Sequence, residues 1–210
     1  MSYHDMALDV LQFLDAQNLQ HVVLVGHSMG GKVAQALSLL HPERVAGLVV
    51  IDIAPVSYTS ADPHWKAVED IMHAMHDATD VSTTSSSAVS ITKQAMDQQL
   101  KPAVPDPALR AFCLTNYNGR DGRWNIPLDA IVDQLDTLAG FDLKLDGLCY
   151  DGDVFIINGG QSRFVRHAYM DRIAAFFPNH MLTTIRGAGH WVHAEAPDDT
   201  VALLKRYLDR

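Results

Sequence analysis

Apolar and polar positions follow two patterns along the chain, and the difference between them predicts its elements. Strand-length segments rich in apolar and β-branched residues are typical of strands buried in a parallel sheet. Segments with helical periodicity lie between them, and the alternation predicts an α/β fold, an open and mostly parallel sheet with helices on both faces. The predicted strands are 22–25, 45–53, 153–158 and 180–185, and the predicted helices are 6–18, 29–40, 163–177 and 197–208.

The pattern changes between residues 57 and 141, where helical segments follow one another and we expect no strand. This predicts a helical lid (57–141) inserted between a first core part (1–56) and a second core part (142–210). Two interpretations of its large apolar side chains stay open: they line a pocket for an acyl chain, or they pack the lid. The expected lid helices lie around 63–75, 88–100, 107–116 and 128–138, and the side chains in question are Trp65, Met72, Met75, Phe112 and Trp124.

Composition narrows the classes of partner. The 210 residues are 48% hydrophobic and 20% charged, with a formal net charge of −9, which argues against nucleic acids and anionic membranes as partners. No apolar run is long enough for a spanning helix, and nothing resembles a signal peptide. The two cysteines, Cys113 and Cys149, fit a reduced cytoplasmic protein, and both are interpreted as packing residues.

We expect neither a cofactor nor a metal ion. His64, His73 and His76 lie close together in the sequence. No carboxylate or cysteine completes a ligand set around them at a recognisable spacing, whereas structural zinc needs about four ligands.

A Gly-x-Ser-x-Gly motif at 26–30 follows the first predicted strand directly. Gly26 and Gly30 let the backbone turn sharply from strand to helix, and the strained turn presents the Ser28 hydroxyl as a nucleophile. The helix begins at Met29, so its free N–H groups and positive dipole end face the group that Ser28 would attack. We therefore expect the Met29 N–H to be an oxyanion donor.

A serine needs a base, and the base needs a third group that holds its tautomer. His190 is the favoured base because its loop follows the last strand, and His193 is the nearest alternative. The loop 158–164 follows the predicted strand 153–158 and contains no carboxylate. Asp151 and Asp153 lie at the opposite, amino-terminal end of that strand. Asp52, at the end of the second strand, is the predicted acid. Trp191, beside the favoured base, is a further substrate-binding candidate.

Four segments, GHSMGGKVAQALSLLHPERV, IDIAPV, GGQSRF and GAGHWVHAEAP, resemble the α/β-hydrolase superfamily and within it the YbfF-type bacterial esterases. The resemblance runs from the first helix to the last residue. It implies a cofactor-independent serine esterase for short esters and acyl thioesters, with a helical cap, and it implies that Asp52 is the triad acid.

Family members begin with further strands and a His-Gly loop that supplies half of the oxyanion hole, and this sequence starts after them. We therefore expect an incomplete, amino-terminally truncated core in which Met29 supplies the remaining donor, at a cost of about 3–4 kcal/mol of transition-state stabilisation. We then expect self-association through the exposed edge of 22–25. Two hypotheses follow: an esterase acting on a small ester or thioester, or a weakly active or non-catalytic remnant that serves as a binding module.

Overall fold

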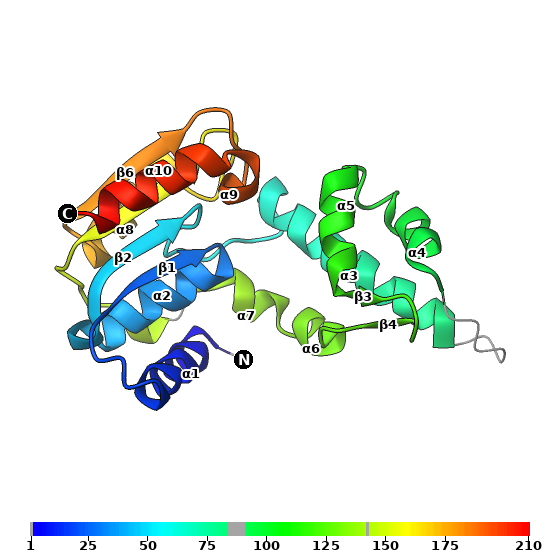
Figure 1. Ribbon diagram of the computed structural model, residues 1–210, viewed down its shortest axis with the longest axis horizontal. Coiled ribbons are helices and arrows are strands. Elements are labelled where there is room, and N and C mark those ends of the chain that lie inside the picture. The colour runs from blue at the N-terminus through cyan, green and yellow to red at the C-terminus, as the bar shows by residue number, and fades with distance from the viewer. Residues whose placement is uncertain (1, 84–90, 142) are drawn as a thin grey trace. The chain divides into compact units, whose positions relative to one another are not determined.

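The computed structural model describes residues 2–83, 91–141 and 143–210. The chain divides into two compact units (Figure 1). The first, here the core unit, comprises Met1–Ser57 and Gly140–Arg210, and the second, here the helical unit, comprises Tyr58–Ala139. Each unit is described by itself.

The core unit is built on a sheet of four parallel strands in the order β1-β2-β5-β6. The strands are β1 (Val22–His27), β2 (Val45–Ile51), β5 (Val154–Gly159) and β6 (His180–Ile185). Every residue of β5 is buried, as the apolar run predicts for an inner strand. The predicted α/β class and parallel sheet are confirmed.

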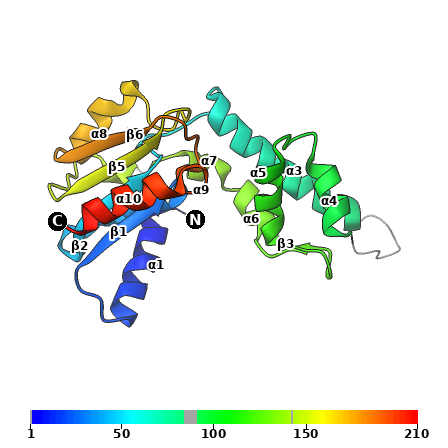
Figure 2. The ribbon, with the colours of Figure 1, turned by 45° about the horizontal axis from the view of Figure 1, so that its top comes forward.

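Alternate residues of each strand point to opposite faces of the sheet, and both faces are covered. On one face α2 (Met29–Leu40) packs closely enough for the backbone at Gly31 to approach the side chain of Val50. On the other face Val49 and Phe155 lie in one apolar cluster with Tyr207 of α10 (Pro197–Leu208), and Figure 2 shows α10 lying along the sheet.

Aromatic rings connect helices that are distant in sequence. Tyr3 of α1 (Tyr3–Ala16) lies 6.4 Å from the ring of Phe141, which lies 5.6 Å from the ring of Phe176 in α8 (Met170–Phe176). The Phe141 ring therefore lies near one aromatic ring of α1 and one of α8. A capping box of Ser2 and Asp5 satisfies the first N–H groups of α1.

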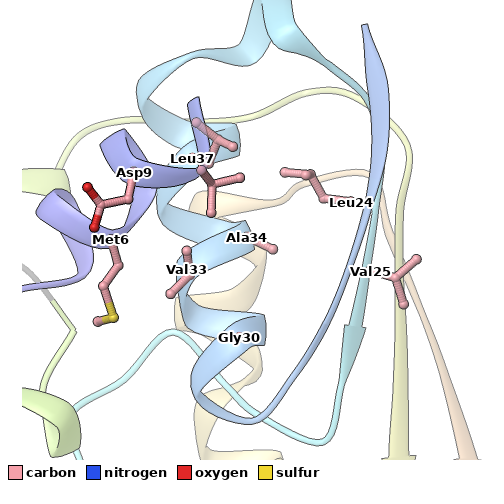
Figure 3. Close-up of a pocket in the computed structure, with 9 residues that line it drawn as sticks. Met6, Asp9, Leu24, Val25, Gly30, Val33, Ala34 and Leu37 are labelled. Carbon is pink, nitrogen blue, oxygen red and sulfur yellow. The ribbon is translucent and has the colours of Figure 1, made fainter. Parts of the chain in front are cut away.

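In the part of the chain that the structure describes, β1 pairs with β2 alone and lies at the edge of the sheet. Val23 and Val25 of β1 are 38% and 49% exposed. A mainly apolar pocket of about 370 Å³ lies between α1, β1 and the first turns of α2, lined by residues that include Met6, Leu24 and Val33 (Figure 3).

The helical unit has its own core, in which Met75, Met96, Leu100 and Tyr117 are fully buried. Its elements are α3 (Pro63–Thr83), α4 (Lys93–Leu100), α5 (Pro107–Cys113), β3 (Tyr117–Asn118), β4 (Arg123–Trp124), α6 (Leu128–Val132) and α7 (Leu135–Ala139). Part of the helix expected at 88–100 lies outside the described residues, and the described part begins at Lys93 after its N-cap Thr92.

The expectation that no strand interrupts the helices is wrong, because β3 and β4 form an antiparallel hairpin. Its turn is closed by polar residues: the side-chain oxygen of Asn118 accepts from the N–H of Arg120, and Gly122 adopts a positive φ of 64°. These are the residue types that β-turns use, so the polar run at 118–124 is a hairpin signal.

Two further expectations for the core unit are corrected. The helix expected from Arg163 begins at Met170, because Phe164 and Val165 are buried and the Phe164 N–H is held by the Ser162 hydroxyl. Cys149 is exposed and is not a packing residue, whereas Cys113 is buried.

The two crossings between the units are anchored by hydrogen bonds. Within the core unit the N–H of Phe141 donates to the Ser57 hydroxyl at 3.2 Å, and within the helical unit the N–H of Tyr58 donates to the carbonyl of Ala139 at 3.0 Å. In the described part of the chain, none of the helices has both the length and the apolar character needed to span a membrane.

Candidate active site

Ser28 occupies the turn between β1 and α2 in a conformation that non-glycine residues rarely adopt, with φ 53° and ψ −122°. Backbone hydrogen bonds hold it there: its N–H donates to the carbonyl of Ile51 at 3.0 Å, and its carbonyl accepts from the N–H of Lys32 at 3.1 Å. The N–H of Met29 is in the first turn of α2, the position expected for an oxyanion donor.

Close backbone approach explains two glycines of the turn, and one of them differs from the prediction. A Cβ on Gly26 would lie 2.3 Å from the carbonyl oxygen of Gly30, so residue 26 has no room for a side chain. A Cβ on Gly30 would meet no heavy atom within 4 Å, whereas one on Gly31 would lie 2.6 Å from Ile53. The second glycine that the packing requires is therefore Gly31, not Gly30.

Asp52 follows β2 and has a positive φ of 53°, as Ser28 has. The residue is completely buried, and its N–H donates to the carbonyl of Ile157 at 2.8 Å. One carboxylate oxygen, Oδ1, accepts from the N–H of Gly159 at 2.9 Å, which fixes the orientation of the side chain. The other oxygen, Oδ2, is directed towards His190.

His190 connects the two strand ends. Its Nε2 lies 2.9 Å from the Ser28 hydroxyl oxygen, and its Nδ1 lies 2.7 Å from Oδ2 of Asp52. The Phe164 ring packs on the imidazole with a centroid separation of 4.3 Å, and the Trp191 ring meets it edge to face at 5.3 Å. The three side chains thus form one hydrogen-bonded chain, Ser28 to His190 to Asp52.

The structure thus brings together three residues that are far apart in sequence. The nearest alternative base, His193, lies in α9 (Val192–Glu195) and packs edge to face on His27 with a centroid separation of 4.7 Å. The carboxylate of Asp153, one of the two rejected acids, lies 3.6 Å from the Arg210 guanidinium.

Five of the six side chains considered for substrate binding belong to the helical unit, and Trp191 lies beside His190 in the core unit. Met75 is buried in the core cluster of the helical unit. Met72 and Trp124 pack against the core cluster of the helical unit. Trp65 is buried and donates its indole N–H to Glu69 at 2.7 Å, whereas Phe112 is 56% exposed.

Comparison with known proteins shows the family of this chain. A family model described as the alpha/beta hydrolase fold matches residues 1–197. The chain belongs to the α/β hydrolases. The esterase YbfF of Escherichia coli is 34% identical over 210 residues, covering 100% of this chain and 76% of that protein. The sn-1-specific diacylglycerol lipase ABHD11 of Mus musculus is 34% identical over 209 residues, covering 99% of this chain and 65% of that protein. A solved structure of a marine microorganism esterase superposes with a TM-score of 0.85 at 31% identity, covering 98% of this chain and 77% of that one.

Two residues of this hydrolase that the sequence reasoning missed lie next to His190. His27 donates from Nε2 to the carbonyl of His190 at 2.8 Å, and burial lowers the pKa of His27 to about 4. Glu195 accepts from the N–H of Gly189 at 2.7 Å and from the N–H of Trp191 at 3.1 Å. A histidine beside the nucleophile and a carboxylate soon after the base are the signals that could have identified them.

The histidines considered for a metal site are in the helical unit of this hydrolase. His76 lies 3.2 Å from a carboxylate oxygen of Asp129 and 3.3 Å from one of Asp77. Among the described residues, no three or more His, Cys, Asp or Glu side chains group in a way that could hold a metal ion.

Proposed function

We propose that this hydrolase is a serine esterase that cleaves carboxylic esters through an acyl-enzyme intermediate, with Ser28 as nucleophile, His190 as base and Asp52 as the acid that orients it. The observation that carries the proposal is the continuous chain of contacts, 2.9 Å from Ser28 to His190 and 2.7 Å from His190 to Asp52. This is the arrangement that activates a serine hydroxyl at neutral pH.

In the first step Nε2 of His190 accepts the proton of the Ser28 hydroxyl while Oγ bonds to the ester carbonyl carbon. The carbonyl oxygen becomes an oxyanion, and the N–H of Met29, at the positive end of α2, stabilises it. The imidazolium of His190 is stabilised by the Asp52 carboxylate. His190 then returns the proton to the leaving alcohol as the carbon–oxygen bond breaks.

In the second step a water molecule takes the place of the alcohol. His190 removes a proton from the water, the resulting hydroxide attacks the acyl carbon, and Ser28 leaves with the proton that His190 returns. No cofactor takes part. The cycle leaves an acid and an alcohol and restores the enzyme.

The substrate class follows from the same chemistry. The relatives are named esterases and lipases, which supports a carboxylic ester as substrate. Acyl thioesters are included in the proposal because the same attack releases a thiol in place of an alcohol. Trp191, whose ring touches His190, is the proposed wall of the acyl site nearest to the reacting atoms.

The test is covalent labelling with a fluorophosphonate, which reacts with an activated serine. We expect the wild-type protein and Ser60→Ala, an exposed control serine, to be labelled. Ser28→Ala and His190→Ala should lose the label together with hydrolysis of p-nitrophenyl esters and of a matched thioester. An unlabelled wild-type protein would favour the alternative of a non-catalytic binding module. A label that persists in Ser28→Ala would refute the assignment of the nucleophile.

A further inference from the structure

The main chain around His190 is held by two side chains that take no part in the proposed chemistry. The carboxylate of Glu195 spans the residue: Oε2 accepts from the N–H of Gly189, and Oε1 accepts from the N–H of Trp191. Each oxygen therefore binds one flank of His190. Hydrogen bonds to a charged acceptor are stronger than neutral ones.

His27 holds the same residue from the other side of its peptide group. Its Nε2 lies 2.8 Å from the carbonyl oxygen of His190, and its ring lies 4.8 Å from the His190 ring. Because a carbonyl only accepts, Nε2 of His27 must carry the proton. Burial lowers the pKa of His27 to about 4, so at neutral pH it is an uncharged donor with one fixed tautomer.

Position matters at His190 because one ring must meet two partners at once. Its nitrogens lie 2.9 Å from Ser28 and 2.7 Å from Asp52, so a movement of the backbone that improves one contact lengthens the other. A displacement of about 1 Å at a reacting group can cost about a hundredfold in rate.

We propose that Glu195 and His27 are positioning residues that clamp the backbone of His190, so that its imidazole reaches Ser28 and Asp52 together. The proposal rests on the proposed function for its kinetic consequence. Its structural content, a fixed main chain at residue 190, is independent of that function.

The clamp predicts a difference between a carboxylate and an amide at position 195. Glutamine has the shape of glutamate but has one acceptor oxygen, so its NH₂ group would face one of the two backbone N–H groups of Gly189 and Trp191. Glu195→Gln therefore keeps the packing and breaks one side of the clamp. Gly189→Ala tests the clamp from its other end, because the added Cβ would lie 3.0 Å from Oε1 of Glu195.

The kinetic experiment compares Glu195→Gln with Glu43→Gln, an exposed glutamate, and His27→Leu with His21→Leu, an exposed histidine, using a p-nitrophenyl ester. We expect kcat to fall about 10- to 100-fold in Glu195→Gln with KM nearly unchanged, and about tenfold in His27→Leu. Gly189→Ala should lower kcat less than Glu195→Gln. The two control variants should match the wild type.

The second readout is the NMR spectrum of the His190 ring, which needs no activity. In the wild type the proton between Nδ1 and Asp52 should resonate far downfield. Glu195→Gln should broaden or lose that signal, while the other resonances remain those of a folded protein. An unchanged NMR signal and an unchanged kcat in both Glu195→Gln and His27→Leu would overturn the proposal and leave the esterase assignment intact. An inactive wild type that still shows the signal, and loses it in Glu195→Gln, would refute the esterase and support the clamp.

Discussion

Replacing Asp52 by asparagine tests the hydrogen-bonded chain most directly, because the surroundings decide how the new amide must point. Oδ1 of Asp52 accepts from the N–H of Gly159 at 2.9 Å, and Oδ2 lies 2.7 Å from Nδ1 of His190. Asparagine has one acceptor oxygen and one NH₂ group. Since the N–H of Gly159 can only donate, the amide oxygen must face Gly159 and the NH₂ group must face His190.

That orientation reverses the tautomer of His190. Nδ1 must then accept a hydrogen bond from the amide, which leaves the imidazole proton on Nε2, 2.9 Å from the Ser28 oxygen. A ring with its proton on Nε2 cannot accept the proton of Ser28. The loss seen when a triad aspartate becomes asparagine is about ten-thousand-fold in kcat. At 1.36 kcal/mol for each tenfold change, this is roughly 5–6 kcal/mol of transition-state stabilisation.

The assay is steady-state hydrolysis of a p-nitrophenyl ester together with the rate of fluorophosphonate labelling. Asp52→Asn should lose kcat with KM nearly unchanged, because Asp52 is completely buried and cannot touch the substrate. Asp151→Asn, an exposed aspartate, is the matched control and should be fully active. A decrease of less than about tenfold in Asp52→Asn would refute the role of Asp52 as the group that sets the tautomer.

Three further predictions concern stability and association. Gly26→Ala should destabilise the fold by about 3 kcal/mol, because its Cβ would lie 2.3 Å from a backbone oxygen. Gly30→Ala should stabilise the fold by up to about 1 kcal/mol, because its Cβ would meet no heavy atom within 4 Å. Equal midpoints of the two variants in urea denaturation would contradict this. Burial lowers the pKa of Lys32 to about 7, so between pH 7 and the normal lysine range the unfolded chain binds the additional proton and stability rises with pH. From pH 7 to pH 9 the free energy of unfolding of the wild type should rise by about 2 kcal/mol relative to that of Lys32→Met in denaturant titrations. A difference that does not change with pH would contradict the lowered pKa of Lys32. The exposed edge of β1 should promote self-association, and Val25→Lys should weaken it. A wild-type protein that sediments as a monomer at every concentration in sedimentation velocity would refute this prediction.

The sequence was most informative where one local pattern determined the structure. The apolar run before Gly26 predicted a strand, and the Gly-x-Ser-x-Gly spacing predicted the strained turn at Ser28, because both depend on neighbouring residues alone. Asp52 was predicted because the loop 158–164 contains no carboxylate and because Asp151 and Asp153 lie at the wrong end of their strand, and the family resemblance implied the same residue. The argument from strand ends uses the rule that ligands gather at the carboxyl ends of parallel strands.

Features set by distant contacts could not be read in the same way. The need for glycine at position 31 depends on Ile53, which approaches from another part of the chain. The helix α8 begins later than predicted because Phe164 does not continue a helix and its ring packs on His190. The hydrogen bonds of Glu195 join side chain and backbone in a loop whose path no local pattern specifies.

The two points at which the chain passes between the units determine how this chain can be altered. Because the N–H of Tyr58 donates to the carbonyl of Ala139, the ends of residues 58–139 are only one hydrogen bond apart. A segment that leaves and returns at one point can be exchanged for another of different length with little change in the entropy of closing the loop. We therefore expect that residues 58–139 can be exchanged for another segment while the order of strands in the sheet stays as it is.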